Sequence, residues 1–356
     1  MLKTNLSLLQ FLGLLLLFAA ACSPRMNKLS SLKDVIIYPS PPDTARIQFL
    51  TSFSSSENAT GKQKAFSRFI FGESPVLPIE KPYGIAVHSG KIYICDSGLG
   101  LLEVIDLEKN TFNYLDPQGG GKLKLPINCC VDDDGKIYVA DGSRRQVIVF
   151  DAKGSYNCAI GDTNKFKPTD VFVTGDKIWV ANIKNNRIHV YSKETKQLLS
   201  TFPETEQGQP GFLYSPSNLW VTPDRVYVSD MGDFKVKIYT HDGKFLSSVG
   251  SNGSNPGQFV RPKGIAVDMD KDLFVVDAGF ENTQIFNKDG KLLLYFGGPY
   301  KGPGDMWLPA KVIIDYDNLK YFQKYVSPAY DLKYLIFVTN QYGPDKVNVY
   351  GSVRPK

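Results

Sequence analysis

A unit of about 45 residues occurs six times along the 356-residue chain, and this repeat constrains the fold more than any other feature. Each unit opens with a proline, and successive prolines are 44, 42, 48, 46 and 47 residues apart. A short apolar strand follows each proline, and a second strand then ends at Asp or Asn. The prolines are Pro82, Pro126, Pro168, Pro216, Pro262 and Pro309, and the acids and amides are Asp96, Asp141, Asn182, Asp230, Asp277 and Asn340.

The rest of each unit supplies two further strands. A third strand alternates polar and apolar residues, most clearly in Gln146–Phe150, and a turn usually leads to a fourth strand such as Lys244–Val249. Four antiparallel strands in every unit of roughly 40 to 50 residues are typical of a propeller blade. We therefore predict an all-β fold, a six-bladed β-propeller of four-stranded antiparallel blades.

The sixth unit has only three strands, because the chain ends after the strand at residues 346–353. The segment 45–53 lies ahead of the first unit and has the alternation of a strand without a partner. We expect it to complete the last blade as its outermost strand, so that joining the two ends of the chain closes the ring. The alternative, a separate N-terminal hairpin, lacks a second strand. The propeller is expected to occupy residues 43–356.

The first 21 residues have the pattern of a secretory signal peptide, with Lys3, an apolar run from Phe11 to Phe18 and three alanines before Cys22. The apolar run is far shorter than the roughly 20 residues that span a bilayer, which disfavours an uncleaved membrane helix. A cysteine at this place resembles the bacterial lipobox, which implies lipidation of Cys22. Ser23, in place of Asp, then favours the outer membrane by Gram-negative sorting rules, with residues 22–42 as a tether.

Charge and cysteine content exclude several functions. The chain has 41 basic and 36 acidic side chains, and a net charge of +5 is too small for a nucleic-acid binder. Contact with the membrane is expected only through the lipid anchor. Cys95, Cys129, Cys130 and Cys158 form no C-x-x-C motif, so covalent haem and thiolate zinc are unsupported, and we expect free buried thiols.

Two segments carry a family resemblance. Lys136–Phe150 and Lys177–Tyr191 resemble the repeat of NHL-type six-bladed propellers, with a strand, Ala-Asp or Ala-Asn, a loop and an Arg-containing strand. The likeness extends over about residues 45–355. It implies a rigid platform for a protein or polymer ligand, since some relatives serve envelope electron-transfer assemblies beside multihaem cytochromes. Without a haem site, this chain would act there only as a partner.

The residue two positions after each proline begins the innermost strand and is expected to border the axis. Asn128, Asp170 and Asn218 are polar in three successive units, and Lys311 lies opposite Asp170. Amide and carboxylate oxygens of this kind can hold a hard divalent cation. The alternative is structural: these side chains cap strand ends, and Lys311 neutralises Asp170 through water. The repeated Asp and Asn residues are expected to accept backbone N–H groups of the turn that follows them.

The axial residues can be compared with the metal ligands of enzymes whose propellers this sequence resembles. Resemblance to peptide-amidating lyases would require axial histidines around zinc, but His88, His189 and His241 do not occupy axial positions. Gluconolactonase-like propellers use Glu, Asn and Asp around a divalent ion, and the glutamate is missing here. We therefore expect no cofactor, with an axial divalent cation as the alternative.

The sixth unit contains an insertion at Asp315–Tyr334, on the rim opposite the polar residues. Tyrosine beside lysine is typical of interface cores, so we predict a docking surface for a partner, made of Tyr316, Tyr321, Phe322, Tyr325 and Tyr330. The alternative is a flap over the channel that packs on its own aromatic contacts.

These patterns together favour a lipid-anchored propeller of the bacterial cell envelope that binds or assembles a protein or polymer partner and has no chemistry of its own. The alternative is a metal-dependent hydrolase or lyase with its ion at the axis. A propeller fold alone does not decide between them.

Overall fold

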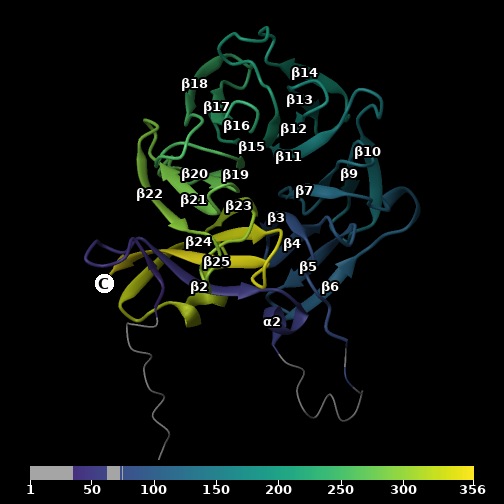
Figure 1. The fold of residues 1–356 in the computed structure, drawn as a ribbon. Helices are drawn as coiled ribbons and strands as arrows, with labels where there is room; N and C mark the ends of the chain where they lie inside the picture. The colour runs from purple at the N-terminus through teal and green to yellow at the C-terminus, as the bar shows by residue number, and fades with distance from the viewer. Residues whose placement is uncertain (1–34, 62–72, 74) are drawn as a thin grey trace, which may run out of the picture. The chain divides into compact units, whose positions relative to one another are not determined.

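Six antiparallel sheets surround a common axis in the computed structural model, which describes residues 35–61, 73 and 75–356 (Figure 1). The leader, Cys22 and the tether up to residue 34 lie outside the described residues. Five sheets have four strands in chain order, and the sixth has five. The predicted six-bladed all-β propeller is therefore confirmed.

The innermost strands begin at the six prolines, and all six second strands end at the predicted Asp or Asn. Blade 1 consists of β3 (Pro82–His88), β4 (Lys91–Asp96), β5 (Leu101–Asp106) and β6 (Thr111–Leu115). Blade 2 consists of β7 (Pro126–Val131), β8 (Ile137–Asp141), β9 (Gln146–Phe150) and β10 (Tyr156–Ile160). Blade 3 consists of β11 (Pro168–Thr174), β12 (Lys177–Asn182), β13 (Arg187–Ser192) and β14 (Leu198–Phe202).

The remaining blades follow the same order around the ring. Blade 4 consists of β15 (Pro216–Val221), β16 (Val226–Asp230), β17 (Lys235–Tyr239) and β18 (Phe245–Val249). Blade 5 consists of β19 (Pro262–Val267), β20 (Leu273–Asp277), β21 (Asn282–Phe286) and β22 (Leu292–Gly297). Blade 6 consists of β23 (Pro309–Asp315), β24 (Tyr330–Asn340), β25 (Val347–Pro355), β2 (Ile47–Phe53) and β1 (Ile37–Tyr38). We call the end of the ring that carries the prolines the upper rim.

The two ends of the chain close the ring as predicted. Strand β2 pairs antiparallel with β25 from Ile47 opposite Ser352 to Phe53 opposite Val347, and Figure 1 shows the two strands side by side. The expected position of β2 at the edge of the blade is wrong, because β1 adds a further strand outside it. The reason is local packing: the Tyr38 ring contacts Phe296 and Tyr350, and its hydroxyl donates to the Gly304 carbonyl. Residues 37–38 thus belong to the sheet and not to a tether.

Short helical segments lie in the connections between strands: α2 (Ser56–Thr60), η2 (Gly119–Gly121), α4 (Leu319–Phe322) and η3 (Gln323–Tyr325). No helix in the described part of the chain is long and apolar enough to cross a bilayer.

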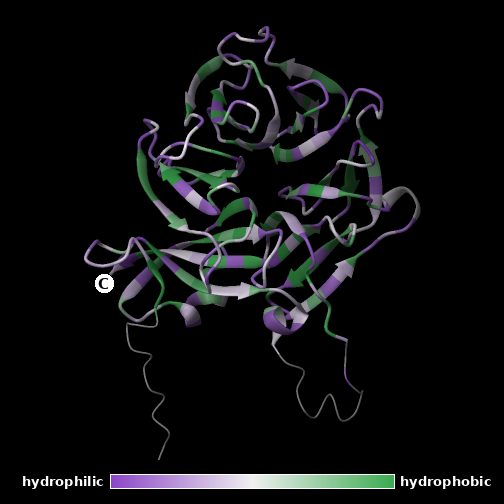
Figure 2. Ribbon diagram, in the orientation of Figure 1, coloured by the Kyte–Doolittle hydropathy of each residue, from purple (hydrophilic) through white to green (hydrophobic). Residues whose placement is uncertain are grey.

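The hydrophobic core is divided among the contacts between blades. Each pair of neighbouring blades encloses one cluster of buried apolar side chains, so six clusters follow one another around the axis. Figure 2 shows the hydrophobic residues concentrated on the strands. Leu50 and Phe53 of β2 belong to the cluster between blades 6 and 1, so closure also fills this part of the core.

Innermost strands approach most closely at two glycines. A Cβ added to Gly264 would lie 2.4 Å from the Lys311 Cα atom of the next blade, and one added to Gly84 would lie 2.5 Å from the Asn128 Cα atom. Both contacts are with backbone, which cannot rotate away as a side chain can. Glycine is therefore required here for neighbouring inner strands to meet.

Gly264→Ala is expected to force β19 and β23 apart and to lower the free energy of unfolding by about 1–3 kcal/mol. Gly302→Ala is the matched control, since no heavy atom lies within 4 Å of the position that its added methyl group would take and its φ is ordinary. Urea unfolding of both variants measures the difference. Equal stability of the two would contradict the close approach.

Candidate functional site

A β-bulge follows the proline of every innermost strand. In β11, for example, Pro168 pairs with Asn182 and Asp170 pairs with Ala181, so Thr169 has no residue opposite it. The same irregularity occurs after the other five prolines. Because a bulge re-aims side chains, the residues one and two positions after the proline both need to be considered at the upper end of the axis.

An ion pair between opposite blades crosses the axis. The Lys311 ammonium of β23 donates to Asp170 Oδ2 of β11 at 2.6 Å, and both side chains are buried. The same oxygen accepts the Leu219 N–H at 3.0 Å and the Asn218 amide at 3.3 Å, and Asp170 Oδ1 accepts the Val171 N–H at 2.9 Å. The contact between Lys311 and Asp170 is direct and does not need the bridging water that the structural interpretation assumed.

The two asparagines complete this buried polar layer. Asn128 donates to the Thr169 carbonyl at 2.8 Å, whereas the Oδ1 atoms of Asn128 and Asn218 are buried without a donor. Two amide oxygens are few for a hard divalent cation, and the neighbouring Asp170 carboxylate is already paired with an ammonium. Among the described residues, no three His, Cys, Asp or Glu side chains come together as a metal site. The donor set therefore does not fit an axial divalent cation.

A second group of polar residues lies at the upper mouth of the axis, and the sequence pattern did not predict it. Lys263 and Tyr83 each follow a blade proline directly, and the Lys263 ammonium lies 5.0 Å from the centre of the Tyr83 ring. Burial, with Asp170 adding a smaller effect, raises the pKa of Tyr83 to about 12. Burial and the nearby Arg261 and Lys81 lower the pKa of Lys263 to about 8. Inspecting the residue after each proline, as well as the next one, would have found both.

Four of the six repeated residues, Asp96, Asp141, Asn182 and Asp277, accept N–H groups of the turn that follows them, as predicted. The backbone N–H groups that bond to Asp230 and Asn340 lie before the blade proline instead. Asp96 accepts the N–H groups of Gly98 and Leu99 in the turn that follows it, and also those of Glu80 and Lys81 before the blade proline. Asp141, Asp230 and Asp277 accept the corresponding N–H groups before their blade prolines. Each carboxylate thereby fixes the entry into a blade.

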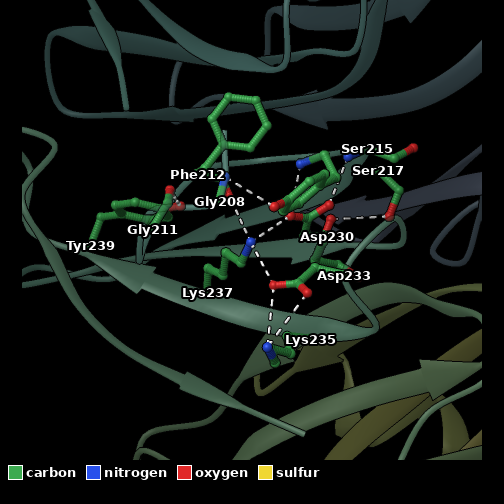
Figure 3. A network of polar contacts seen from close by, with 12 residues as sticks. Gly208, Gly211, Phe212, Ser215, Ser217, Asp230, Asp233, Lys235, Lys237 and Tyr239 are labelled. Atoms are coloured by element: carbon green, nitrogen blue, oxygen red, sulfur yellow. Dashed lines mark hydrogen bonds and ion pairs between the residues drawn. The ribbon is translucent and has the colours of Figure 1, made fainter. Parts of the chain in front are cut away.

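Blade 4 adds a buried cation to this arrangement (Figure 3). The Lys237 ammonium lies 2.8 Å from both Asp230 Oδ2 and Asp233 Oδ2, and it also donates to the Phe212 carbonyl. Lys235 pairs with Asp233 from the other side at 3.4 Å. Lys237 is thus a fully partnered buried lysine, in contrast to Lys263.

In blade 1 the equivalent position, seven residues after the Asp, holds Glu103 instead of lysine. Burial and the neighbouring Asp96 raise the pKa of Glu103 to about 11. As a carboxylate, Glu103 would have no donor for either oxygen, whereas the protonated acid can donate to Asp96. Glu103 is therefore a neutral acid in the folded protein.

The insertion of blade 6 is mainly a flap on the lower rim. Phe322 is buried in the core between blades 6 and 1 and contacts Phe53 and Phe337, so it is not available to a partner as predicted. Tyr321 packs against the same core, and Tyr316 packs on the Tyr334 ring. The short helix α4 explains this, because it places its apolar side chains toward the blade.

Two of the predicted docking residues lie farther out on the insertion. Tyr325 is 40% exposed, with the Lys324 ammonium 4.9 Å from its ring centre, and Tyr330 is half-buried where β24 begins. Above the insertion, an apolar cavity of about 150 Å³ occupies the lower part of the axis, and Cys130 and Lys311 contribute to its wall. The four described cysteines are free thiols.

Comparison with known proteins supports the propeller fold. Residues 211–282 match a family model described as a 6-bladed beta-propeller. No match is found among curated proteins.

Solved structures are similar in fold at low identity. A structural genomics protein of unknown function from Bacteroides thetaiotaomicron is 15% identical with a TM-score of 0.59, over 87% of this chain and 76% of that one. A gluconolactonase from Xanthomonas campestris is 15% identical with a TM-score of 0.55, over 88% and 99%. A virginiamycin B lyase from Staphylococcus aureus is 13% identical with a TM-score of 0.51, over 76% and 94%. These likenesses show the fold, which both enzymes and proteins of unknown function share.

Lys311→Met is expected to leave Asp170 buried without its cation and to lower the free energy of unfolding by about 3–5 kcal/mol. The double variant Lys311→Met with Asp170→Asn removes both charges and should recover much of that loss. Thermal unfolding of the two variants provides the measurement. If the double variant is no more stable than Lys311→Met, the ion pair is not what the single substitution disrupts.

Glu103→Gln is expected to stabilise the protein increasingly as pH rises. Because the folded-state pKa of Glu103 is raised to about 11, its contribution to stability is fully present below the unfolded pKa near 4.3 and is lost as pH increases toward 11. Glutamine keeps a donor for Asp96 and does not ionise. Melting temperatures at pH 5, 7 and 9 should show a gap over the wild type that widens with pH, and a constant gap would refute the neutral acid.

Proposed function

We propose that this chain is a non-catalytic binding propeller of the bacterial cell envelope, attached to the outer membrane by a lipid on Cys22, which recruits a protein or polymer partner. The lipobox-like leader supports the anchor and the location. The NHL-like repeats support a platform function. The ion pair between Asp170 and Lys311 supports a role without axial metal chemistry, because the Lys311 ammonium already neutralises the carboxylate that a metal ion would need as a ligand.

The observation that carries the proposal is an exposed aromatic surface on the upper rim. Trp307 and Tyr342 are 47% and 46% exposed and adjacent, since the Tyr342 N–H donates to the Trp307 carbonyl. The Tyr300 ring stacks on Trp307 with centroids 6.0 Å apart, and the Lys81 ammonium lies 5.2 Å from the Tyr342 ring centre. We call Tyr300, Trp307, Tyr342 and Lys81 the upper aromatic surface.

Rigid aromatic rings beside cations are the composition of binding hot spots. Large apolar rings are seldom left exposed together without a use. In the insertion on the lower rim, in contrast, most aromatic residues pack against the protein itself, and the more exposed of its lysine–tyrosine contacts is that of Lys324 with Tyr325. The upper aromatic surface is therefore the preferred docking site, and Tyr325 marks the second.

The alternative, a metal-dependent hydrolase or lyase, has support from the enzymes among the structures of similar fold. The axial donors argue against it, as two orphaned amide oxygens and one ion-paired carboxylate make a poor cation site.

Affinity capture from detergent-solubilised envelope should identify the partner, whose affinity for purified variants can then be measured. Trp307→Ala with Tyr342→Ala is expected to weaken binding by at least tenfold, because each ring removes hot-spot contact area. Tyr325→Ala with Lys324→Ala on the lower rim is the matched control and should bind nearly as the wild type. Loss of binding only in the lower-rim variant would move the docking site there, and one tightly held calcium or zinc ion per chain after dialysis would favour the enzyme.

A further inference from the structure

Lys263 is a buried lysine without a counter-ion. Its side chain is 7% exposed, and its ammonium makes no hydrogen bond or ion pair with another described residue. The contact with the Tyr83 ring is its one close polar interaction in the described part of the chain. Burying an unpaired charge is costly, so proteins seldom keep such a lysine where nothing binds it.

The geometry places this ammonium at the mouth of the axis. Lys263 belongs to blade 5 and Tyr83 to blade 1, and blade 6 lies between them in the ring. At the equivalent position blade 6 has only Ala310, which leaves room for the lysine to reach Tyr83. The side chain therefore spans the upper end of blade 6 instead of pairing within its own blade.

Two further cations lie near Lys263, and no ion pair joins them to an acid among the described residues. Arg261 and Lys81 are close enough to lower its pKa, and neither forms an ion pair with a described residue. Asp170, the acid that acts on Tyr83, is already paired with Lys311. The carboxylates of Asp96 and Asp277 in blades 1 and 5 accept backbone N–H groups on both oxygens. Three positive charges thus lie near one end of the axis, and none of them is ion-paired within the described part of the chain.

Lys263, its neighbours Arg261 and Lys81, and the Tyr83 hydroxyl can all donate hydrogen bonds. The ammonium groups of Lys263 and Lys81 and the guanidinium of Arg261 donate hydrogen bonds and accept none. The Tyr83 hydroxyl makes no hydrogen bond with a described residue. Such a set selects a ligand with several acceptor oxygens and negative charge. The fork of Arg261 and the point charges of Lys263 and Lys81 match a phosphate group better than a single carboxylate, because phosphate supplies two charges and three free oxygens.

We propose that the upper mouth of the axis binds a phosphate group through Lys263, Arg261 and the Tyr83 hydroxyl, with Lys81 at its edge. This inference rests on the proposed binding function and deepens it, since the phosphate site lies beside the upper aromatic surface and shares Lys81 with it. A phosphorylated small molecule or a phosphate-bearing polymer would place its anion in the mouth and its remaining part over the aromatic rings.

Thermal unfolding with inorganic phosphate and with phenyl phosphate tests the site. Each is added at 10 mM against potassium chloride of equal ionic strength, which removes general screening from the comparison. The wild-type melting temperature should rise by about 3 °C or more with at least one probe. An effect of phenyl phosphate alone would identify the ligand as a phosphate ester, and an effect of both would indicate recognition of the anion itself. No shift with either probe overturns the proposal.

Lys263→Met separates binding from folding. Without ligand the variant should melt at a higher temperature than the wild type, because it no longer buries an unpaired charge, and it should lose the phosphate-induced shift. Lys184→Gln changes an exposed lysine in a turn of the same rim and should keep the shift. If Lys184→Gln loses as much of the shift as Lys263→Met, the effect is unspecific attraction and the proposal fails.

The same assay distinguishes this inference from the proposed function. The variant Trp307→Ala with Tyr342→Ala should no longer bind the protein or polymer partner. Inorganic phosphate should still raise its melting temperature, because the mouth binds the anion without the aromatic rings. A phosphate shift that persists when no envelope partner can be captured would leave the anion site standing and reject the scaffold function. Partner binding that is normal in Lys263→Met, with no phosphate shift in the wild type, would reject the anion site alone.

Discussion

The pairing of β2 with β25 is the contact on which the rest of the ring depends. Each blade buries both of its faces against neighbouring blades. An open ring would therefore expose the apolar faces of its two end blades to water. The cluster between blades 6 and 1 receives Leu50 and Phe53 from β2, and the cluster between blades 5 and 6 receives Ile47. Closure by the N-terminal strand therefore completes two of the six core regions as well as one sheet.

Most of the fold follows from the repeat, whereas much of the candidate site does not. The prolines, the strand-ending acids and the unpaired strand at residues 45–53 were enough to predict six blades and their closure. Of the axial polar residues, Asn218 and Lys311 contact Asp170, whereas Asn128 donates to the Thr169 carbonyl. The bulge after each proline was not predicted, because proline also begins strands that have no bulge, and the irregularity becomes visible only in the register of β3 with β4 and its equivalents. Simple alternation therefore pointed to the residue two after the proline and overlooked Tyr83 and Lys263.

The insertion shows a different limit of sequence reasoning. Its tyrosines and lysines have the composition of an interface, yet composition does not reveal which face of a single helical turn packs inward. Phe322 is buried because α4 lies against Phe53 and Phe337, which are distant in sequence. Trp307 and Tyr342 are exposed in the loops of blades 5 and 6 on the upper rim, and backbone hydrogen bonds between the two loops make them neighbours.

The three buried lysines of the upper rim differ in whether an anion of the fold neutralises them. Lys237 contacts two carboxylates and a carbonyl, and Lys311 contacts Asp170, so each buried cation is matched within the fold. Lys263 alone among these three has no anion, although it occupies the same rim and is nearly as buried. The strand-ending Asp residues that accept backbone N–H groups recur from blade to blade, so they do not select one ligand over another. Specificity has to come from the positions where the blades differ, and the unpaired Lys263 is such a position, beside the aromatic rings that are proposed to hold the rest of a ligand.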